Sequence, residues 1–160
     1  MLNVLKIYEL RRDVFIKASQ DEVFSFFSQA KNLNAITPPW LHFEILTPLP
    51  IKIGRQTRID YSLKLLGLRF PWKTEITEWQ PPDLFIDKLI KGPYRHWEHT
   101  HRFKRKNHGT VMQDIVLYAV PGFVLAPPLH FFFVRSRLEK IFSYREEALL
   151  RIFKEASPKP

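Results

Sequence analysis

The stretch LHFFFVRSRLEKIFSYREEALLRIF, residues 129–153, decides the fold of this chain. Its apolar residues recur at three- and four-residue steps, which places them on one face of a helix of roughly seven turns. They are Val134, Leu138, Ile141, Ala148, Leu149 and Ile152. The charged residues fall mostly on the remaining surface. A helix with one apolar face must pack that face against another element, so its partner has to lie in the preceding chain.

The preceding chain consists mainly of strand-like segments. The first candidate strand covers residues 4–17, and a short helix follows it, because Ser19 and Glu22 have the spacing of a capping box. Residues 31–36 indicate a second short helix. Six further strands are predicted, separated by Gly and Pro turns. They cover residues 43–47, 56–65, 70–79, 84–90, 94–105 and 110–120. We therefore expect an α+β fold in which a seven-stranded curved antiparallel sheet surrounds a long C-terminal helix.

Composition sets the class of protein. The chain has 160 residues, of which 45% are hydrophobic and 14% aromatic, so it is long and apolar enough to bury a core. We expect a single domain over residues 1–156 and a disordered tail at 157–160. Because there is no Cys, disulfides and cysteine metal sites are excluded. Residues 1–10 carry Lys6 and Glu9 without a continuous apolar core, so we expect no signal peptide and a cytoplasmic protein.

The formal net charge is +9. The basic residues are spread along the chain, with one local group at 102–106. Attraction to an anionic partner such as a phospholipid surface is one interpretation. Solvated outer faces of strands and a hairpin tip are the other, and no nucleic-acid-binding motif accompanies the charge. We therefore expect no nucleic-acid partner.

Five parts of the chain carry a family resemblance, and together they span nearly all of it. They are DEVFSFF at 21–27, NL at 32–33, ITPPW at 36–40, GPY at 92–94 with Trp97 and HTH at 99–101, and IFSYR at 141–145. With these, the sequence resembles the START/Bet v 1-like (SRPBCC) superfamily in its bacterial cyclase/dehydrase, or polyketide-cyclase, branch. More closely, it is similar to the small ligand-binding domains that occur alone or joined to nucleotide-sugar-epimerase-like domains.

The resemblance implies a helix-grip fold with a cavity between the sheet and the C-terminal helix. It implies binding of a hydrophobic small molecule that is lipid-, polyketide- or terpenoid-like, without catalysis as the leading case. The alternatives are a polyketide cyclase, dehydratase or aromatase, and an interaction module for an epimerase-like or membrane partner. No catalytic residue is carried over, because the chain holds no shared catalytic motif.

The predicted strand 94–105 carries the most unusual face. Side chains alternate along a strand, so two imidazoles share a face with two aromatic rings. These residues are Trp97, His99, His101 and Phe103. If Asn107 and His108 form a two-residue turn, paired residue numbers sum to 215, which places His101 opposite Asp114. Asp87 lies on the corresponding face of the strand before, near His99.

Four interpretations of this face remain open. The polar groups satisfy one another; or they orient the head of a ligand; or they perform acid/base catalysis, with Asp114 holding His101 in one tautomer. Zinc binding is the fourth, but the sequence places no third ligand, so we expect neither metal nor cofactor. The candidate catalytic residues are His101 and Asp114. The candidate ligand-binding residues are Trp97, His99, His101, Phe103, Tyr61, Trp72, Asp87, Tyr118, Leu138 and Phe142.

Two further features border the predicted cavity. Arg145 interrupts the apolar face of the long helix; it either pairs with a cavity carboxylate, binds an anionic head group, or extends to water at the helix edge, which we favour. Residues 115–134 carry no formal charge, yet four Pro and Gly residues exclude a membrane-spanning helix. Residues 121–133 predict an apolar loop at the cavity mouth, either a packed lid or a contact with a membrane or a partner protein.

Overall fold

The computed structural model describes residues 5–121, 128 and 130–156. Seven strands form one antiparallel sheet in the order β1-β7-β6-β5-β4-β3-β2, as predicted. The strands are β1 Tyr8–Ile16, β2 Glu44–Ile45, β3 Arg58–Leu65, β4 Leu68–Gln80, β5 Leu84–Lys91, β6 His96–Lys106 and β7 Gly109–Ala119. The first strand is shorter than predicted, and residues 5–7 lie outside it. Its ladder with β7 begins at the pair Tyr8–Tyr118.

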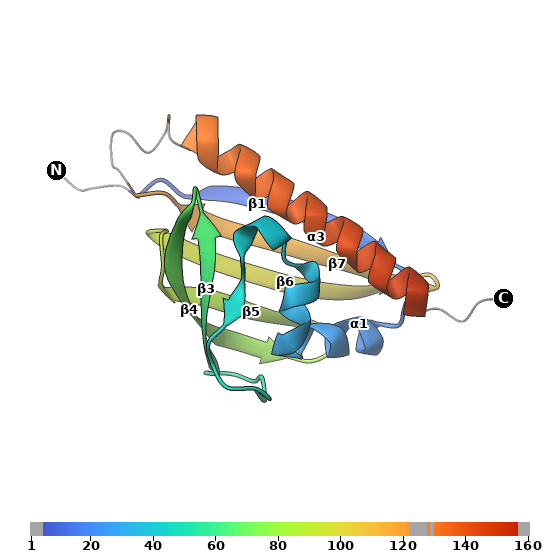
Figure 1. Cartoon of the computed structure of the whole chain (residues 1–160). Coiled ribbons are helices and arrows are strands. Elements are labelled where there is room, and N and C mark those ends of the chain that lie inside the picture. The colour runs from blue at the N-terminus through green and yellow to red at the C-terminus, as the bar shows by residue number, and fades with distance from the viewer. Residues whose placement is uncertain (1–4, 122–127, 129, 157–160) are drawn as a thin grey trace.

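Two bulges curve the sheet. In the β4–β5 ladder Ile76 pairs with Asp87 and Glu78 pairs with Ile86, which leaves Thr77 as an extra residue. A second shift lies between the pairs Thr74–Leu89 and Lys73–Lys91 of the same ladder. Bulges bend the strands that carry them and increase their twist. The sheet therefore wraps around the long helix instead of lying flat beneath it (Figure 1).

The predicted short helices follow β1. Helix α1 (Gln20–Phe27) begins with the predicted capping box: the Glu22 backbone N–H donates to Ser19 Oγ at 3.3 Å, and the Ser19 N–H donates to Glu22 Oε2 at 2.8 Å. The 3₁₀ helices η1 (Ala30–Ile36) and η2 (Pro39–Leu41) come next. Together these elements cover one end of the sheet and close one side of the space beneath the long helix (Figure 1).

The long C-terminal helix consists of a π-helical turn, η4 (His130–Val134), followed by α3 (Arg135–Ala156). It runs across the concave face of the sheet (Figure 1). Leu138 and Leu149 are buried on its sheet side, and an ion pair from Glu139 to Arg12 of β1 ties it to the sheet edge. In the described ranges, no helix is long and apolar enough to cross a membrane.

Two apolar clusters lie between α3 and the sheet. We call the first the packed half; its α3 residues come from the C-terminal part of the helix. Its buried members are Val14, Ile16, Val23, Phe24, Phe27, Ile36, Ile76, Phe85, Phe103, Met112, Ala148, Leu149 and Phe153. We call the second the cavity half. Its buried members are Leu10, Leu63, Trp72, Trp97, Val116, Tyr118, Val120, Leu138 and Phe142.

Candidate functional site

A cavity of about 180 Å³ lies between the sheet and α3. Its walls are mainly apolar and come from β3 to β6, the short helices and α3. Eight of the predicted site residues line it: Tyr61, Trp72, Asp87, Trp97, His99, His101, Leu138 and Phe142. The sequence reasoning thus found residues from five different elements by assigning the inward face of each strand and helix.

The remaining predicted site residues lie behind this wall. Phe103 packs against Phe24 and Phe27 of α1, with ring centroids 5.4 Å apart in each pair. Burial raises the pKa of Tyr118 to about 12, and its hydroxyl is hydrogen-bonded to His130 Nε2 at 2.7 Å. Asp114 does not line the cavity; three of its partners, His99, His101 and Arg145, stand between it and the cavity. The strand periodicity therefore correctly predicted that these side chains face inward. It did not predict that they lie in the core behind the cavity wall.

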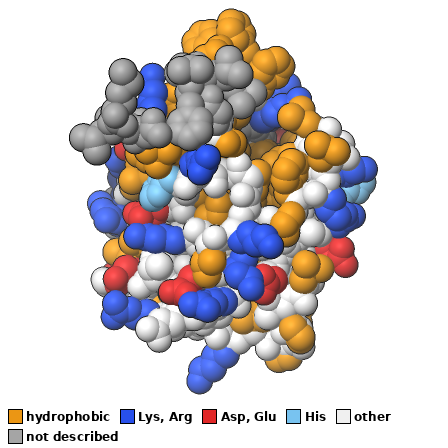
Figure 2. All heavy atoms as spheres, turned by 90° about the vertical axis from the view of Figure 1, so that its left-hand side faces the viewer, with side chains coloured by type: hydrophobic (Ala, Val, Ile, Leu, Met, Phe, Trp, Pro, Cys, Tyr) orange, Lys and Arg blue, Asp and Glu red, His pale blue; other side chains and the backbone are white. Residues whose placement is uncertain are grey.

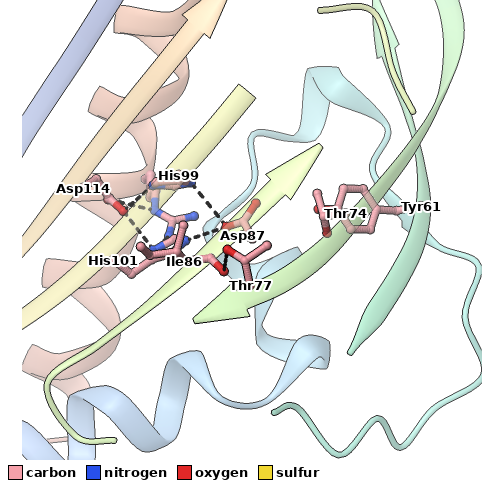
Figure 3. A network of polar contacts seen from close by, with 9 residues as sticks. Tyr61, Thr74, Thr77, Ile86, Asp87, His99, His101 and Asp114 are labelled. Atoms are coloured by element: carbon pink, nitrogen blue, oxygen red, sulfur yellow. Dashed lines mark hydrogen bonds and ion pairs between the residues drawn. The ribbon is translucent and has the colours of Figure 1, made fainter. Parts of the chain in front are cut away.

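The β6–β7 register is the predicted one, with His101 opposite Asp114 and His99 opposite Val116. Asp87 of β5 lies opposite His99. The hydrogen bonds run diagonally across this register, however. His99 Nε2 is 2.7 Å from Asp114 Oδ1, and His101 Nε2 is 3.0 Å from Asp87 Oδ2 (Figure 3). Asp114 therefore contacts both rings: the contact with His101 that one interpretation required is present, with Nδ1 at 3.1 Å, and the one with His99 is shorter.

Arg145 completes this polar cluster from α3. Its Nε lies 3.2 Å from Asp114 Oδ2, and its Nη2 lies 3.4 Å from His101 Nδ1. The Arg145 side chain is only 11% exposed, and the guanidinium stands over the Phe27 ring at 5.2 Å. The favoured prediction, that Arg145 extends to water at the helix edge, is wrong. The positive charge of Arg145 is balanced inside the protein, because the Asp114 carboxylate on the sheet faces it.

Burial and charge fix the protonation of the cluster. Burial alone would raise the pKa of Asp114, but the Arg145 guanidinium, His99 and hydrogen bonds from both imidazoles hold that pKa well below its usual range. Burial lowers the pKa of His99, and His101 lowers it further, against the attraction of Asp114. A neutral His99 that donates its Nε2–H to ionised Asp114 has a lone pair on Nδ1. This nitrogen is 3.9 Å from Asp87 Oδ2.

Two tyrosines add hydroxyl groups to the wall. The Tyr61 hydroxyl and Thr74 Oγ1 are 3.0 Å apart across the β3–β4 ladder (Figure 3). Burial raises the pKa of Tyr61, and nearby Asp87 raises it further. Tyr94, whose pKa burial also raises, lines the cavity from the turn before β6. The sequence reasoning missed Tyr94 as a wall residue because a turn has no periodicity from which its direction can be inferred.

A second hollow, which we call the outer groove, has a volume of about 590 Å³. Its walls include Trp40, Leu66 and Phe132, all more than half exposed. Three residues line both spaces: Leu41, Leu65 and Ile141. The groove is therefore the outer side of the cavity wall. Figure 2 shows hydrophobic side chains gathered toward one end of the molecule among lysines and arginines.

One subset of the cluster has the donor types of a metal site. Asp87, His99 and His101 each offer one ligand atom, and these atoms all lie within 4.8 Å of one another. The sequence alone placed no third ligand beside the two histidines. The structure supplies Asp87 from the neighbouring strand.

A curved antiparallel sheet that encloses a cavity against a long C-terminal helix defines the helix-grip class of domains. The model of one family, described as polyketide cyclase/dehydrase and lipid transport, matches residues 16–141. The chain belongs to this family. A search of curated proteins finds no match.

Solved structures agree on the fold. The Zhui aromatase/cyclase of Streptomyces superposes with a TM-score of 0.74 at 14% identity, covering 93% of this chain and 94% of that one. A protein of Thermus thermophilus gives 0.70 at 20% identity, covering 94% of this chain and 100% of that one. A norcoclaurine synthase of Thalictrum, in complex with a transition-state analogue, gives 0.68 at 16% identity over 95% and 97% of the two chains. At these identities the likeness establishes the fold alone.

Proposed function

We propose that the protein binds a hydrophobic small molecule that carries a hydroxyl group. The apolar body lies among Trp72, Trp97 and Phe142, and the hydroxyl meets the polar cluster. One observation carries this proposal: two hydrogen-bond acceptors, the Asp87 carboxylate and His99 Nδ1, lie beside each other in the wall of the cavity. The Asp87 carboxylate lines the cavity, and His99 keeps its Nδ1 lone pair because its N–H is used on Asp114. A hydroxyl head group donates its proton to one of these acceptors, whereas an ionised carboxylate has no proton to donate to either.

The size of the cavity favours a ligand that extends beyond it. Pockets for drug-sized ligands hold about 300–1,000 Å³, and this cavity holds about 180 Å³. One or two rings fit inside it. A longer lipid-, polyketide- or terpenoid-like molecule has to pass Leu41, Leu65 and Ile141 into the outer groove, which has the volume to take its remainder. The hydroxyl stays at the closed, polar end.

Calorimetry with a matched pair of probes tests the proposal. Alpha-naphthol and its methyl ether have the same ring system, but only the former donates a hydrogen bond. We expect naphthol to bind about 2- to 100-fold more tightly, the equivalent of one hydrogen bond up to an unsatisfied buried partner. Asp87→Ala should bring this ratio close to one. Glu98→Ala, which removes a carboxylate paired with Lys88 outside the cavity, is the control and should leave the ratio unchanged. Equal affinities for the two probes in the unmodified protein would contradict the proposal.

A cyclase-type reaction is the second candidate, because the Asp114–His99 pair places a neutral imidazole at the cavity with a free lone pair. In this role His99, not His101, is the general base, and Asp114 holds its tautomer. His99→Ala and Asp114→Asn would each lower turnover of a poly-keto model substrate by about 10²–10⁴, as expected for loss of general-base catalysis. Product analysis that finds no conversion by the unmodified protein leaves binding as the function.

Exposed phenylalanines favour contact with an anionic membrane at the outer groove. Phe131 and Phe132 are each 68% exposed in η4, and Arg137 and Lys140 stand beside the groove. Of the predicted loop 121–133, residues 122–127 and 129 lie outside the described residues. Phe132→Asp should reduce co-sedimentation with phosphatidylserine vesicles at low salt, while Ile90→Asp, an exposed apolar residue outside the groove, should not. Absence of vesicle binding at low salt would remove this role. An epimerase-like partner and a cytoplasmic location stay predictions.

A further inference from the structure

Three cavity-facing ligand atoms from neighbouring strands converge on one point. His99 and His101 are two residues apart on β6, so their rings lie next to each other on the same face, with centroids 3.8 Å apart and planes tilted by 36°. Asp87 on β5 pairs directly with His99. Its Oδ2 lies 3.0 Å from His101 Nε2 and 3.9 Å from His99 Nδ1. Figure 3 shows the Asp87 carboxylate facing both rings from the neighbouring strand.

The opposite nitrogens of both rings face a second carboxylate. His99 Nε2 is 2.7 Å from Asp114 Oδ1, and His101 Nδ1 is 3.1 Å from the same oxygen. Metal-binding histidines commonly donate their other N–H to a carboxylate, which fixes the tautomer and aims the free nitrogen at the metal. Here one carboxylate takes this position for both rings. Arg145 holds the second oxygen of Asp114, so the carboxylate keeps its place.

We propose that Asp87 Oδ2, His99 Nδ1 and His101 Nε2 bind a divalent transition-metal ion of the zinc type. All three residues line the cavity, so the fourth coordination position opens toward it. An open fourth position accepts water or a hydroxyl or carbonyl oxygen of an organic molecule. Two imidazoles and one carboxylate suit Zn²⁺, Co²⁺ or Fe²⁺, whereas Mg²⁺ and Ca²⁺ prefer all-oxygen sites.

The distances require only small side-chain movements. Tetrahedral ligands at about 2.0–2.2 Å from a zinc ion are separated by about 3.3–3.6 Å. The two separations from Asp87 Oδ2, 3.0 and 3.9 Å, bracket this value, and all three ligand atoms lie within 4.8 Å of one another. The composition of the cluster also suits a cation, because it holds two acidic side chains, Asp87 and Asp114, and one guanidinium, that of Arg145.

Titration with Co²⁺ tests the site without any organic ligand. Tetrahedral cobalt absorbs visible light strongly, so binding is followed by spectrum and by calorimetry, and Zn²⁺ should displace the cobalt at one ion per chain. His99→Ala, His101→Ala and Asp87→Ala should each abolish the cobalt spectrum. Asp114→Asn should weaken affinity by about 10- to 100-fold, as loss of an outer partner does. His96→Ala, on β6 but outside the cavity, is the matched control and should leave binding unchanged.

NMR on the unmodified protein tests the metal site without any substitution, so the test does not depend on whether a variant folds. Cobalt should shift two imidazole N–H signals, that of His99 Nε2 and that of His101 Nδ1, because each ring binds the metal through its other nitrogen. Shifted signals from other histidines, no cobalt spectrum, or a spectrum that survives all three ligand substitutions would overturn the proposal. Naphthol binding measured in the presence of a chelator tests the proposed ligand separately, so either proposal can fail alone.

Discussion

The packed half and the cavity half are covered by the same helix and rest on the same sheet, yet only one is filled. In the packed half, α1 inserts Val23, Phe24 and Phe27 between the sheet and α3. In the cavity half, Leu138 and Phe142 of α3 face Trp72 and Trp97 across a hollow. Helix α1 and the 3₁₀ helix η1 fill the packed half, and their residues Phe27 and Ile36 also form the near wall of the cavity. The long helix is apolar along both halves. The size of the cavity therefore depends on the elements that pack beside this helix.

The polar cluster lies at the boundary between the halves. The His101 ring stacks on Phe85 of the packed half, with centroids 4.1 Å apart. The His99 ring contacts Phe142 of the cavity half, with centroids 5.5 Å apart. The packed half thus supports one side of the cluster while the cavity reaches the other side. A rigid support on one side and open space on the other is the arrangement that a binding site requires.

The largest expected effect comes from removing charge at this boundary. Asp114→Asn keeps the shape of the side chain but leaves Arg145 buried without its carboxylate. Breaking a buried ion pair on one side costs about 3–5 kcal/mol. Urea denaturation should show this loss, while Asp60→Asn, which removes an exposed partner of Lys73, should change stability by less than about 1 kcal/mol. A loss below 1 kcal/mol for Asp114→Asn would mean that the cluster is hydrated and not supported by the packed half.

The second prediction compares the two halves directly through α3. Leu149 in the packed half is fully buried, and Leu138 is 3% exposed but lines the cavity. Leucine-to-alanine changes in cores cost about 2–5 kcal/mol, and the cost grows with the empty volume they create. Leu149→Ala should cost more than Leu138→Ala, which only enlarges an existing hollow and should stay near 2 kcal/mol. Equal losses in chemical denaturation would show that the cavity closes in solution.

The third prediction concerns the tight packing around the backbone of β1 and β7, next to the packed half. A Cβ added at Gly109, where β7 begins, would collide with the Ile16 carbonyl oxygen and the Phe15 ring. Gly109→Ala should therefore cost about 1–3 kcal/mol, as overpacking does. Gly54→Ala is the matched control, because an added Cβ there meets no atom within 4 Å. Equal thermal stabilities of the two variants would show that β1 and β7 can separate at this point without loss.

Much of the fold and part of the site could be predicted from the sequence. The alternation of side chains along a strand and the register of a hairpin both depend on residues that are close in sequence. Alternation along β6 placed His99 and His101 on the inward face, and a two-residue turn fixed the pairing of His101 with Asp114. The family resemblance added the helix-grip fold. Contacts between elements that are distant in sequence did not follow. Arg145 on α3 reaches Asp114 only because the sheet curves, and periodicity carries no information on curvature.

The same limit explains the site residues that the sequence misassigned. Alternation separates inward from outward side chains, but it does not separate a cavity wall from the core behind it. Phe103 and Tyr118 are inward in this sense, and they are covered by α1 and by His130, respectively. Which imidazole makes the shorter contact with Asp114 depends on side-chain rotation, which the register does not determine. Asp87, the third residue of the proposed metal site, was predicted to lie near His99, but its contact with His101 does not follow from the strand register.

The smallest expected effect is at the outer end of the cavity half, where His130 stacks on Tyr8 at 3.5 Å and bonds to the Tyr118 hydroxyl. His130→Phe keeps the stacked ring and removes the hydrogen bond, so it should cost about 0.5–1.5 kcal/mol at pH 8.

Burial, with Arg135 and Lys6 nearby, lowers the pKa of His130, so the folded state prefers the neutral ring. That contribution is complete above the unfolded pKa of about 6.5 and is lost as the pH falls below it, because only the unfolded chain then gains the proton readily. The stability difference between the unmodified protein and His130→Phe should therefore shrink between pH 8 and pH 5. A difference for His130→Phe that grows on acidification would mean that the folded state stabilises the charged ring, and that this end of the cavity half is open to water.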